Sequence, residues 1–83
     1  MKVIITEHAA KCFNKLDKKA HQKLGHALRK LYDFPEVANV RRLRGTPGKY
    51  RLRVGDWRII FAVDWKKDTL VVLTIAHRKD AYK

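Results

Sequence analysis

The chain has 83 residues and a formal net charge of +12, from 20 lysines and arginines against 8 aspartates and glutamates. This length allows one small domain, expected to span residues 1–83, and a single cysteine excludes an internal disulfide and a cysteine-based zinc cluster. Solubility requires a net charge of only about 2 to 8 in a small domain, so the excess indicates an anionic partner such as nucleic acid or an acidic protein.

The first half of the chain predicts one strand followed by two helices. Residues 3–5 form a short apolar run typical of a strand, and Thr6 is placed to cap the helix that follows. Asp17 interrupts the helical spacing and is placed to cap a second helix, which Pro35 stops just after Phe34. The second helix carries an apolar stripe typical of a core-facing helix: Ala20, Leu24, Ala27, Leu28 and Leu31.

The second half predicts three or four strands joined by short turns. Residues 40–44 form a candidate strand that ends at the Gly-Thr-Pro-Gly turn of residues 45–48. A hairpin follows over residues 50–61, and a last apolar strand over residues 69–76 comes after another turn. Short connections favour antiparallel neighbours, so the order strand–helix–helix–(three to four strands) predicts an α+β fold. In it, a helical hairpin packs on one face of a twisted, mainly antiparallel sheet.

The hairpin, YRLRVGDWRIIF, places arginines on one face and apolar residues on the other. Gly55 supplies the positive φ that a two-residue turn needs, which pairs Arg53 with Arg58 and Arg51 with Ile60. Like charges directly opposite each other in a sheet are destabilising, so this arrangement predicts an anion-binding face. The other face supplies core residues: Tyr50, Leu52, Val54, Trp57, Ile59 and Phe61.

The tail adds a fourth arginine to this face if the last hairpin has the right register. A five-residue turn would pair Asp64 with Leu70. It would also pair Arg58 with Ala76 and bring Arg78 to the arginine face. A turn one residue shorter or longer would send Arg78 to the opposite face, because a one-residue slip inverts a strand. We therefore expect a shallow groove, with His77 or Tyr82 nearby, lined by four arginines: Arg51, Arg53, Arg58 and Arg78.

These four arginines indicate phosphate chemistry. Guanidinium groups are planar, forked donors that stay charged at physiological pH, and several around one phosphate stabilise a pentacoordinate transition state. RNA supplies its own nucleophile, the 2′-hydroxyl, so cleavage by that route needs positioning and proton transfer but no metal. The chain has no serine and no carboxylate cluster with metal-ligand spacing, so we expect no cofactor and no metal.

Two stretches, YRLRVGDWRIIFAVDW and VLTIAHRKDAYK, resemble the RelE/ParE superfamily of bacterial and archaeal toxins, and within it the RelE-like mRNA interferases. The shared pattern is a strand with alternating basic residues, a glycine turn, an aromatic–Arg–hydrophobic strand and a tail with Arg and Tyr. The LRGTPG turn and the order of elements also match, so the resemblance covers nearly the whole chain. It implies a toxin of a type II toxin–antitoxin system that enters the ribosomal A site and binds 16S rRNA. There it cuts the mRNA codon by metal-independent 2′-hydroxyl attack.

The resemblance also implies residue roles and a partner. Matching by position assigns catalytic roles to Arg53, Arg58, Arg78 and Tyr82. We further assign RNA binding to Arg51, Lys49, Arg44 and His77. A cognate antitoxin with an acidic or amphipathic segment would wrap the toxin in a hetero-oligomer and block or distort the site.

One departure from the family pattern concerns proton transfer. Some members have lysines where this chain has Arg51 and Arg53, and arginine holds its proton too firmly to act as a general base. Histidine titrates near neutral pH, but a last strand that continues as far as Arg78 would place His77 on the opposite face from Arg78. The general base is therefore left unassigned.

Two other functions stay open at this point. A ParE-like toxin that inhibits DNA gyrase has the same fold, so fold alone does not decide. A non-catalytic RNA- or ribosome-binding domain would keep the charge but tolerate loss of Tyr82 and of the arginine geometry. A lone thiol, no signal peptide and no apolar run long enough to cross a bilayer predict a cytoplasmic protein without membrane partners.

Overall fold

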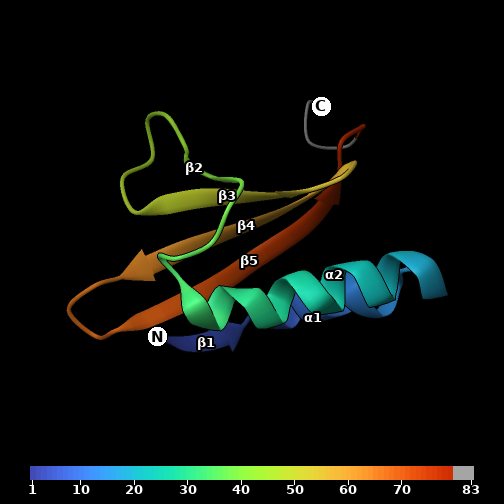
Figure 1. Cartoon of the computed structure of the whole chain (residues 1–83), viewed down its shortest axis with the longest axis horizontal. Helices are drawn as coiled ribbons and strands as arrows, with labels where there is room; N and C mark the ends of the chain where they lie inside the picture. The colour runs from blue at the N-terminus through green and yellow to red at the C-terminus, as the bar shows by residue number, and fades with distance from the viewer. Residues whose placement is uncertain (80–83) are drawn as a thin grey trace.

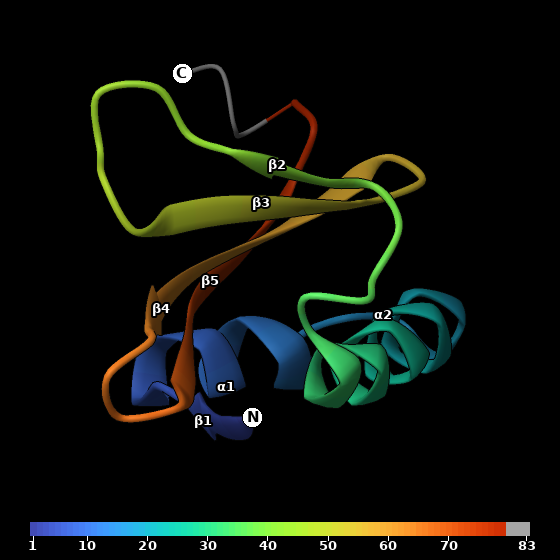
Figure 2. The same ribbon diagram turned by 60° about the vertical axis from the view of Figure 1, so that its left-hand side comes forward.

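The structure, a computed structural model, describes residues 1–79 as a five-stranded sheet with two helices on one face (Figures 1 and 2). The strand order is β1-β5-β4-β3-β2, with β1 parallel to β5 and all other neighbours antiparallel. The predicted α+β fold is confirmed. No helix within residues 1–79 is long and apolar enough to span a bilayer. The elements are β1 (Lys2–Ile5), α1 (Glu7–Asn14), α2 (Lys18–Lys30), the 3₁₀ helix η1 (Leu31–Asp33), β2 (Val40–Arg42), β3 (Lys49–Val54), β4 (Trp57–Asp64) and β5 (Thr69–His77).

Both helices begin where the sequence predicts. The Thr6 hydroxyl accepts a hydrogen bond from the backbone N–H of Ala9 at 3.1 Å, and the Asp17 carboxylate accepts one from Ala20 at 2.8 Å. Each bond satisfies an N–H group that has no partner within its own helix. The second helix ends earlier than predicted, because α2 gives way after Lys30 to the tighter turn of η1.

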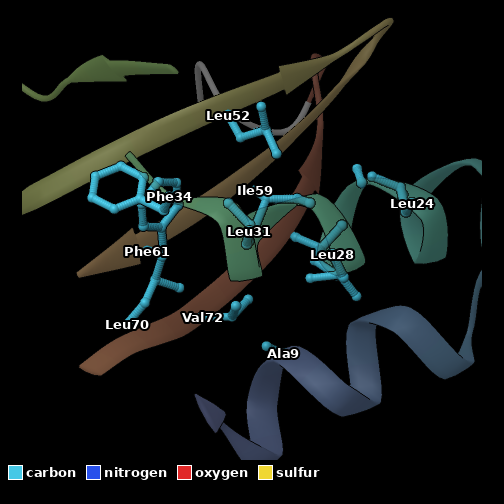
Figure 3. Packing of buried hydrophobic residues seen from close by; sticks show 12 residues of the cluster. Ala9, Leu24, Leu28, Leu31, Phe34, Leu52, Ile59, Phe61, Leu70 and Val72 are labelled. Atoms are coloured by element: carbon cyan, nitrogen blue, oxygen red, sulfur yellow. The ribbon is translucent and has the colours of Figure 1, made fainter. Parts of the chain in front are cut away.

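The core lies between the two helices and one face of the sheet (Figure 3). The predicted stripe of α2 is buried in it, apart from the half-buried Ala20. The Phe34 ring packs edge-on against Phe61 and Tyr50, with ring centroids 5.5 and 5.4 Å apart. The largest fully buried side chains are Phe61, Leu24, Leu31, Ile59, Leu70 and Val72. Removal of this apolar surface from water is the main driving force that fixes the sheet to the helices.

The β3–β4 hairpin has the predicted register. Arg53 lies opposite Arg58. Gly55 has a φ of 59°, the left-handed conformation that a two-residue hairpin turn requires at its first position. Side chains alternate between the two faces of a strand, so burial of Leu52 and Ile59 against the helices turns the arginines to the open face.

The turn of the β4–β5 hairpin is one residue shorter than predicted. Asp64 pairs with Thr69 rather than with Leu70. The Asp64 carboxylate accepts hydrogen bonds from the backbone N–H groups of two turn residues, at 3.1 and 3.2 Å, and so stabilises the shorter turn. An unbroken strand from this turn would send Arg78 to the helix side of the sheet.

A β-bulge at Leu73 restores the predicted register further along β5. Leu73 is an extra residue on β5, opposite the junction of Ile60 and Phe61 on β4. Its carbonyl accepts a hydrogen bond from the Thr6 hydroxyl at 3.2 Å, which ties the bulge to the junction of β1 and α1. Beyond the bulge, Arg58 pairs with Ala76 as predicted.

Strand β2 ends at Arg42, two residues earlier than predicted. The N–H of Leu43 still donates to the carbonyl of Lys49 at 2.9 Å, after which the chain turns away. Arg44 therefore lies in the turn between β2 and β3 rather than on a strand face.

Candidate functional site

The open face of the sheet carries a hollow of about 390 Å³, which we call the arginine hollow. Three strands, β2, β3 and β4, supply its arginines, and the segment before β2 supplies an asparagine. The hollow faces away from the helices, because the residues that alternate with the β3 and β4 arginines are in the core. The lining residues are Asn39, Arg41, Arg51, Arg53 and Arg58.

Two pairs of arginines lie directly opposite each other on this surface. Arg41 pairs with Arg51 across β2 and β3, and Arg53 pairs with Arg58 across β3 and β4. Directly opposed side chains have Cβ atoms about 4.5–5.5 Å apart, and like charges at that spacing are destabilising. An anion bound between them would offset this repulsion.

The four arginines reach different depths. Arg58 is only 8% exposed and is the one buried charged side chain among residues 1–79. Arg51 is half-buried, and its Nε, although inaccessible to water, has no hydrogen-bond partner in this part of the chain. Arg41 and Arg53 are exposed. An entering anion would therefore meet exposed guanidinium groups at the rim and Arg58 at the base of the hollow.

Three of the four arginines form no ion pair within residues 1–79. No carboxylate oxygen of residues 1–79 lies within 4.0 Å of the guanidinium nitrogens of Arg41, Arg51 or Arg53. A concave surface lined by one sign of charge concentrates counter-ions. A phosphate group entering it would accept charge-assisted hydrogen bonds, which are about twice as strong as neutral ones.

Arg78 is not among the residues that line the hollow. Its backbone N–H donates to the carbonyl of Asp56 at 2.6 Å, which extends the β4–β5 pairing to the tip of the arginine hairpin. Its guanidinium lies 3.9 Å from the Asp56 carboxylate, and the two side chains are 64% and 67% exposed. Exposed ion pairs are weak, worth about 0–1 kcal/mol. Arg78 is thus held at the hairpin tip by a contact that an anionic ligand could replace.

The other predicted RNA contacts are spread over the molecule. Lys49 lies opposite Ala62 and is exposed beside the hollow. Arg44 borders a different hollow, in the turn after β2. His77 lies opposite Trp57 on the helix side of the sheet, with the two rings edge-on at 4.9 Å. β5 ends at His77, so strand parity does not extend to Arg78. Tyr82 lies outside the described residues.

Arg41 and Asn39 line the hollow, although neither was predicted as a site residue. Arg41 belonged to the predicted strand over residues 40–44. Side chains alternate along a strand, so Val40 on the core face places Arg41 on the open face once β2 is paired with β3. Asn39 has a φ of 67°, and its carbonyl accepts a hydrogen bond from the N–H of Arg53 at 3.1 Å. Asparagine tolerates the left-handed conformation better than most residues, but its place at the hollow depends on a pairing that the sequence does not reveal.

The arginine hollow can bind and stabilise negative charge, and its own side chains supply no nucleophile. The groups that line it are guanidinium groups and one amide, without a carboxylate, imidazole or hydroxyl. Within residues 1–79, no group of three or more His, Cys, Asp or Glu side chains is placed to hold a metal ion. The chemistry that fits is recognition of a phosphodiester and stabilisation of the extra charge that it gains on attack.

Inorganic phosphate is expected to raise the melting temperature of the chain in a concentration-dependent manner. A ligand that binds only the folded state adds about 1 kcal/mol at five times its dissociation constant. The double variant Arg51→Thr/Arg53→Thr should lose most of this gain, and without phosphate it should be no less stable than the parent, because it lacks one member of each opposed pair. Thermal unfolding followed by circular dichroism, with chloride at matched ionic strength as the control, measures both effects. Equal phosphate shifts in the two proteins would contradict the assignment of the hollow.

Comparison with known proteins gives consistent matches. The family described as "ParE toxin of type II toxin-antitoxin system, parDE" matches residues 3–82. A curated protein of Methanocaldococcus jannaschii, named "Putative toxin RelE1", is 33% identical over 48 residues, which are 58% of this chain and 53% of that protein. The chain thus spans about half the length of that curated relative.

Solved structures share the fold. The archaeal RelE–RelB complex from Pyrococcus horikoshii contains a chain that is 28% identical, with a TM-score of 0.74 and a coverage of 93% of both chains. The toxin–antitoxin complex RelBE2 from Mycobacterium tuberculosis contains one that is 24% identical, with a TM-score of 0.80, covering 93% of this chain and 96% of that chain.

Proposed function

This chain belongs to the ParE toxin family of type II toxin–antitoxin systems, within the RelE/ParE superfamily, and we propose that it is a ribosome-dependent endoribonuclease that cleaves mRNA in the A site. The observation that carries the proposal is the arginine hollow, in which four guanidinium groups line one open surface. Toxins of this superfamily also inhibit DNA gyrase, and the matching family bears the ParE name. The structural match to an archaeal RelE chain at 28% identity and the phosphate chemistry of the hollow favour RNA cleavage.

The proposed reaction needs no protein nucleophile. The 2′-oxygen of one nucleotide attacks the adjacent phosphorus, the bond from phosphorus to the 5′-oxygen breaks, and a 2′,3′-cyclic phosphate and a 5′-hydroxyl are released. The proton of the 2′-hydroxyl passes to a base, and the departing 5′-oxygen takes up a proton. The protein's contribution is to hold the phosphate in line and to stabilise the charge of the pentacoordinate state.

We assign the principal charge-stabilising role to Arg58. It is the most buried of the four arginines, and a charge acts more strongly where water is excluded. Arg53 lies directly opposite and contacts the same phosphate from the rim. Arg51 and Arg41 form the second opposed pair, two residues away along β3. They therefore bind the next phosphate of the RNA backbone.

Proton transfer is assigned to groups outside the hollow's own lining. A guanidinium group is a poor general base, and His77 lies on the other side of the sheet, against Trp57. Arg78, at the hairpin tip, and Tyr82, in the tail, keep the catalytic roles that the resemblance assigns to them, and neither is named as the general base.

The partner that we propose is an antitoxin, which would bind the toxin in a hetero-oligomer in the cytoplasm. Two of the structural relatives come from complexes, the RelE–RelB complex and the toxin–antitoxin complex RelBE2. A net charge of +12 favours an acidic partner, and carboxylates would offset the repulsion between the opposed arginines while the toxin is inactive.

A cleavage assay on stalled ribosomes tests the function. The purified chain is incubated with a defined mRNA, once free and once on ribosomes with an open A site, and the 5′ ends are mapped by primer extension. Cuts inside the A-site codon that require ribosomes are expected. Cuts in free mRNA alone would indicate a general ribonuclease, and the absence of cuts in both samples would overturn the enzyme assignment. A gyrase cleavage assay on the same preparation would then decide for or against the ParE-like alternative.

A further inference from the structure

A second hollow lies between α2 and the end of β3, on the opposite side of β3 from the arginine hollow. It has a volume of about 290 Å³, and we call it the α2–β3 groove. One wall is a face of α2, and the other is formed by the last three residues of β3, just before Gly55. The chain between α2 and β2 crosses from the helix layer to the far edge of the sheet beside it (Figure 2) and closes its third side with Ala38 and Asn39.

The groove has an apolar floor and a cationic rim. Ala27 and Leu52, buried to 6% and 4% exposure, and the half-buried Val54 form the floor. Lys23 and Lys30, one on each side of Ala27 along α2, are exposed at the rim. The Lys23 side chain extends across to the β3–β4 turn and packs closely on Gly55. A Cβ atom at Gly55 would lie only 2.6 Å from the Lys23 Nζ.

The residues that line the groove determine which kind of ligand can bind in it. No residue that lines the groove is acidic, so a ligand with carboxylates is attracted. The aliphatic floor accommodates a side chain such as leucine or valine. RNA is the less suitable ligand, because bases in single strands are held by stacking on aromatic side chains, and no phenylalanine, tyrosine or tryptophan lines this groove.

Two residues connect this groove with the arginine hollow. Arg53 and Asn39 line both, and they are joined by the hydrogen bond from the N–H of Arg53 to the carbonyl of Asn39. Arg53 is exposed, and no carboxylate of residues 1–79 forms an ion pair with it. Its guanidinium can therefore be engaged from either side.

We propose that the α2–β3 groove is the docking surface for an acidic segment of a partner protein that inserts an aliphatic side chain between Lys23 and Lys30. A carboxylate of the same segment binds Arg53 and withdraws it from the phosphate in the arginine hollow. The assignment rests on the proposed function in one respect, that the partner is the antitoxin. Inhibition then requires neither coverage nor distortion of the whole active face, because the segment competes for one shared arginine.

A peptide-binding experiment tests the docking surface without ribosomes. The probe is a fluorescein-labelled synthetic peptide in which Leu and Val alternate with Asp and Glu, and binding to the full chain is followed by anisotropy. Lys23→Glu/Lys30→Glu should weaken binding by about tenfold or more. The matched control Lys15→Glu/Lys66→Glu has the same net charge and changes only exposed lysines outside the groove, so it should change binding far less. Ala38→Trp, which fills the groove from its exposed loop, should also weaken binding.

Several results would overturn the docking surface. Equal losses in the groove and control variants would mean that the whole positive surface attracts the peptide. Unchanged binding of a peptide with Ser in place of Leu and Val would exclude the apolar floor. The proposal would also be overturned if the peptide does not bind the parent chain. The same holds if the groove variants lose affinity for single-stranded RNA rather than for the peptide. Each readout is independent of mRNA cleavage, so its failure is distinguishable from failure of the proposed function.

The shared arginine is tested with inorganic phosphate. Saturating peptide should reduce the phosphate-dependent rise in melting temperature, and Arg53→Thr should abolish this antagonism while the peptide still binds through the lysine rim. Additive effects of peptide and phosphate in the parent chain would overturn the competition for Arg53.

Discussion

Replacement of Arg58 by alanine is expected to lower the rate of mRNA cleavage on ribosomes by about two to three orders of magnitude, the usual cost of one preorganised charge-stabilising donor. Arg58 is 8% exposed, so no other side chain can take its place without rebuilding the base of the hollow. Arg58→Lys keeps the charge but lacks the planar fork of donors, so it should recover only part of the loss. Single-turnover cleavage at a saturating toxin concentration measures the effect.

The control for Arg58 is Arg29→Ala, which removes an exposed arginine from α2, on the other side of the sheet. It should leave the single-turnover rate nearly unchanged. Because Arg58 is buried, thermal unfolding of each variant accompanies the assay, and rates are compared only below the lowest melting temperature. A folded Arg58→Ala variant that cleaves within a few-fold of the parent would contradict the role of this residue.

Replacement of Phe61 by alanine is expected to lower the free energy of unfolding by about 3–5 kcal/mol. Phe61 is fully buried, and its ring contacts those of Phe34 and Tyr50 at centroid distances of 5.5 and 5.6 Å. A small domain has a total stability of only about 5–15 kcal/mol, so the loss removes a large share of it and would unfold a chain at the low end of that range. Urea denaturation followed by tryptophan fluorescence measures the loss.

Two further variants make the Phe61 result interpretable. Phe61→Leu keeps much of the volume and should cost less than Phe61→Ala, which gives a folded protein if the alanine variant unfolds. Tyr32→Ala removes a side chain that is 57% exposed and should change stability by less than about 0.5 kcal/mol. A loss below about 1 kcal/mol in Phe61→Ala would mean that the aromatic cluster does not hold the sheet to the helices as described.

Most of the fold followed from local patterns in the sequence. Thr6 and Asp17 cap the helices as expected, and Gly55 fixes the two-residue turn that opposes Arg53 to Arg58. These features depend on a few neighbouring residues, which is why the sequence contained enough information. The three hairpin arginines meet at one hollow for the same reason, since side-chain alternation places them on one face.

The register of β5 could not be derived in the same way. Residues 70–73 are all apolar, so alternation does not indicate which two face the core. The choice depends on the Asp64 turn and on the bond from the Thr6 hydroxyl to the Leu73 carbonyl, a contact between residues far apart in the chain. Arg41 was missed for a related reason, because its place depends on the pairing of β2 with β3 across a long turn.

The bulge at Leu73 also affects how sequences of this family should be aligned. The predicted five-residue turn without a bulge and the observed shorter turn with one use the same number of residues between Ile60 and Thr74. A relative could exchange one arrangement for the other without any insertion or deletion. A gap-free alignment of two such proteins would match every arginine correctly and yet equate core positions with surface positions over residues 70–73. We therefore expect relatives whose arginine hollows superimpose to carry different hydrophobic residues at matched positions within residues 70–73.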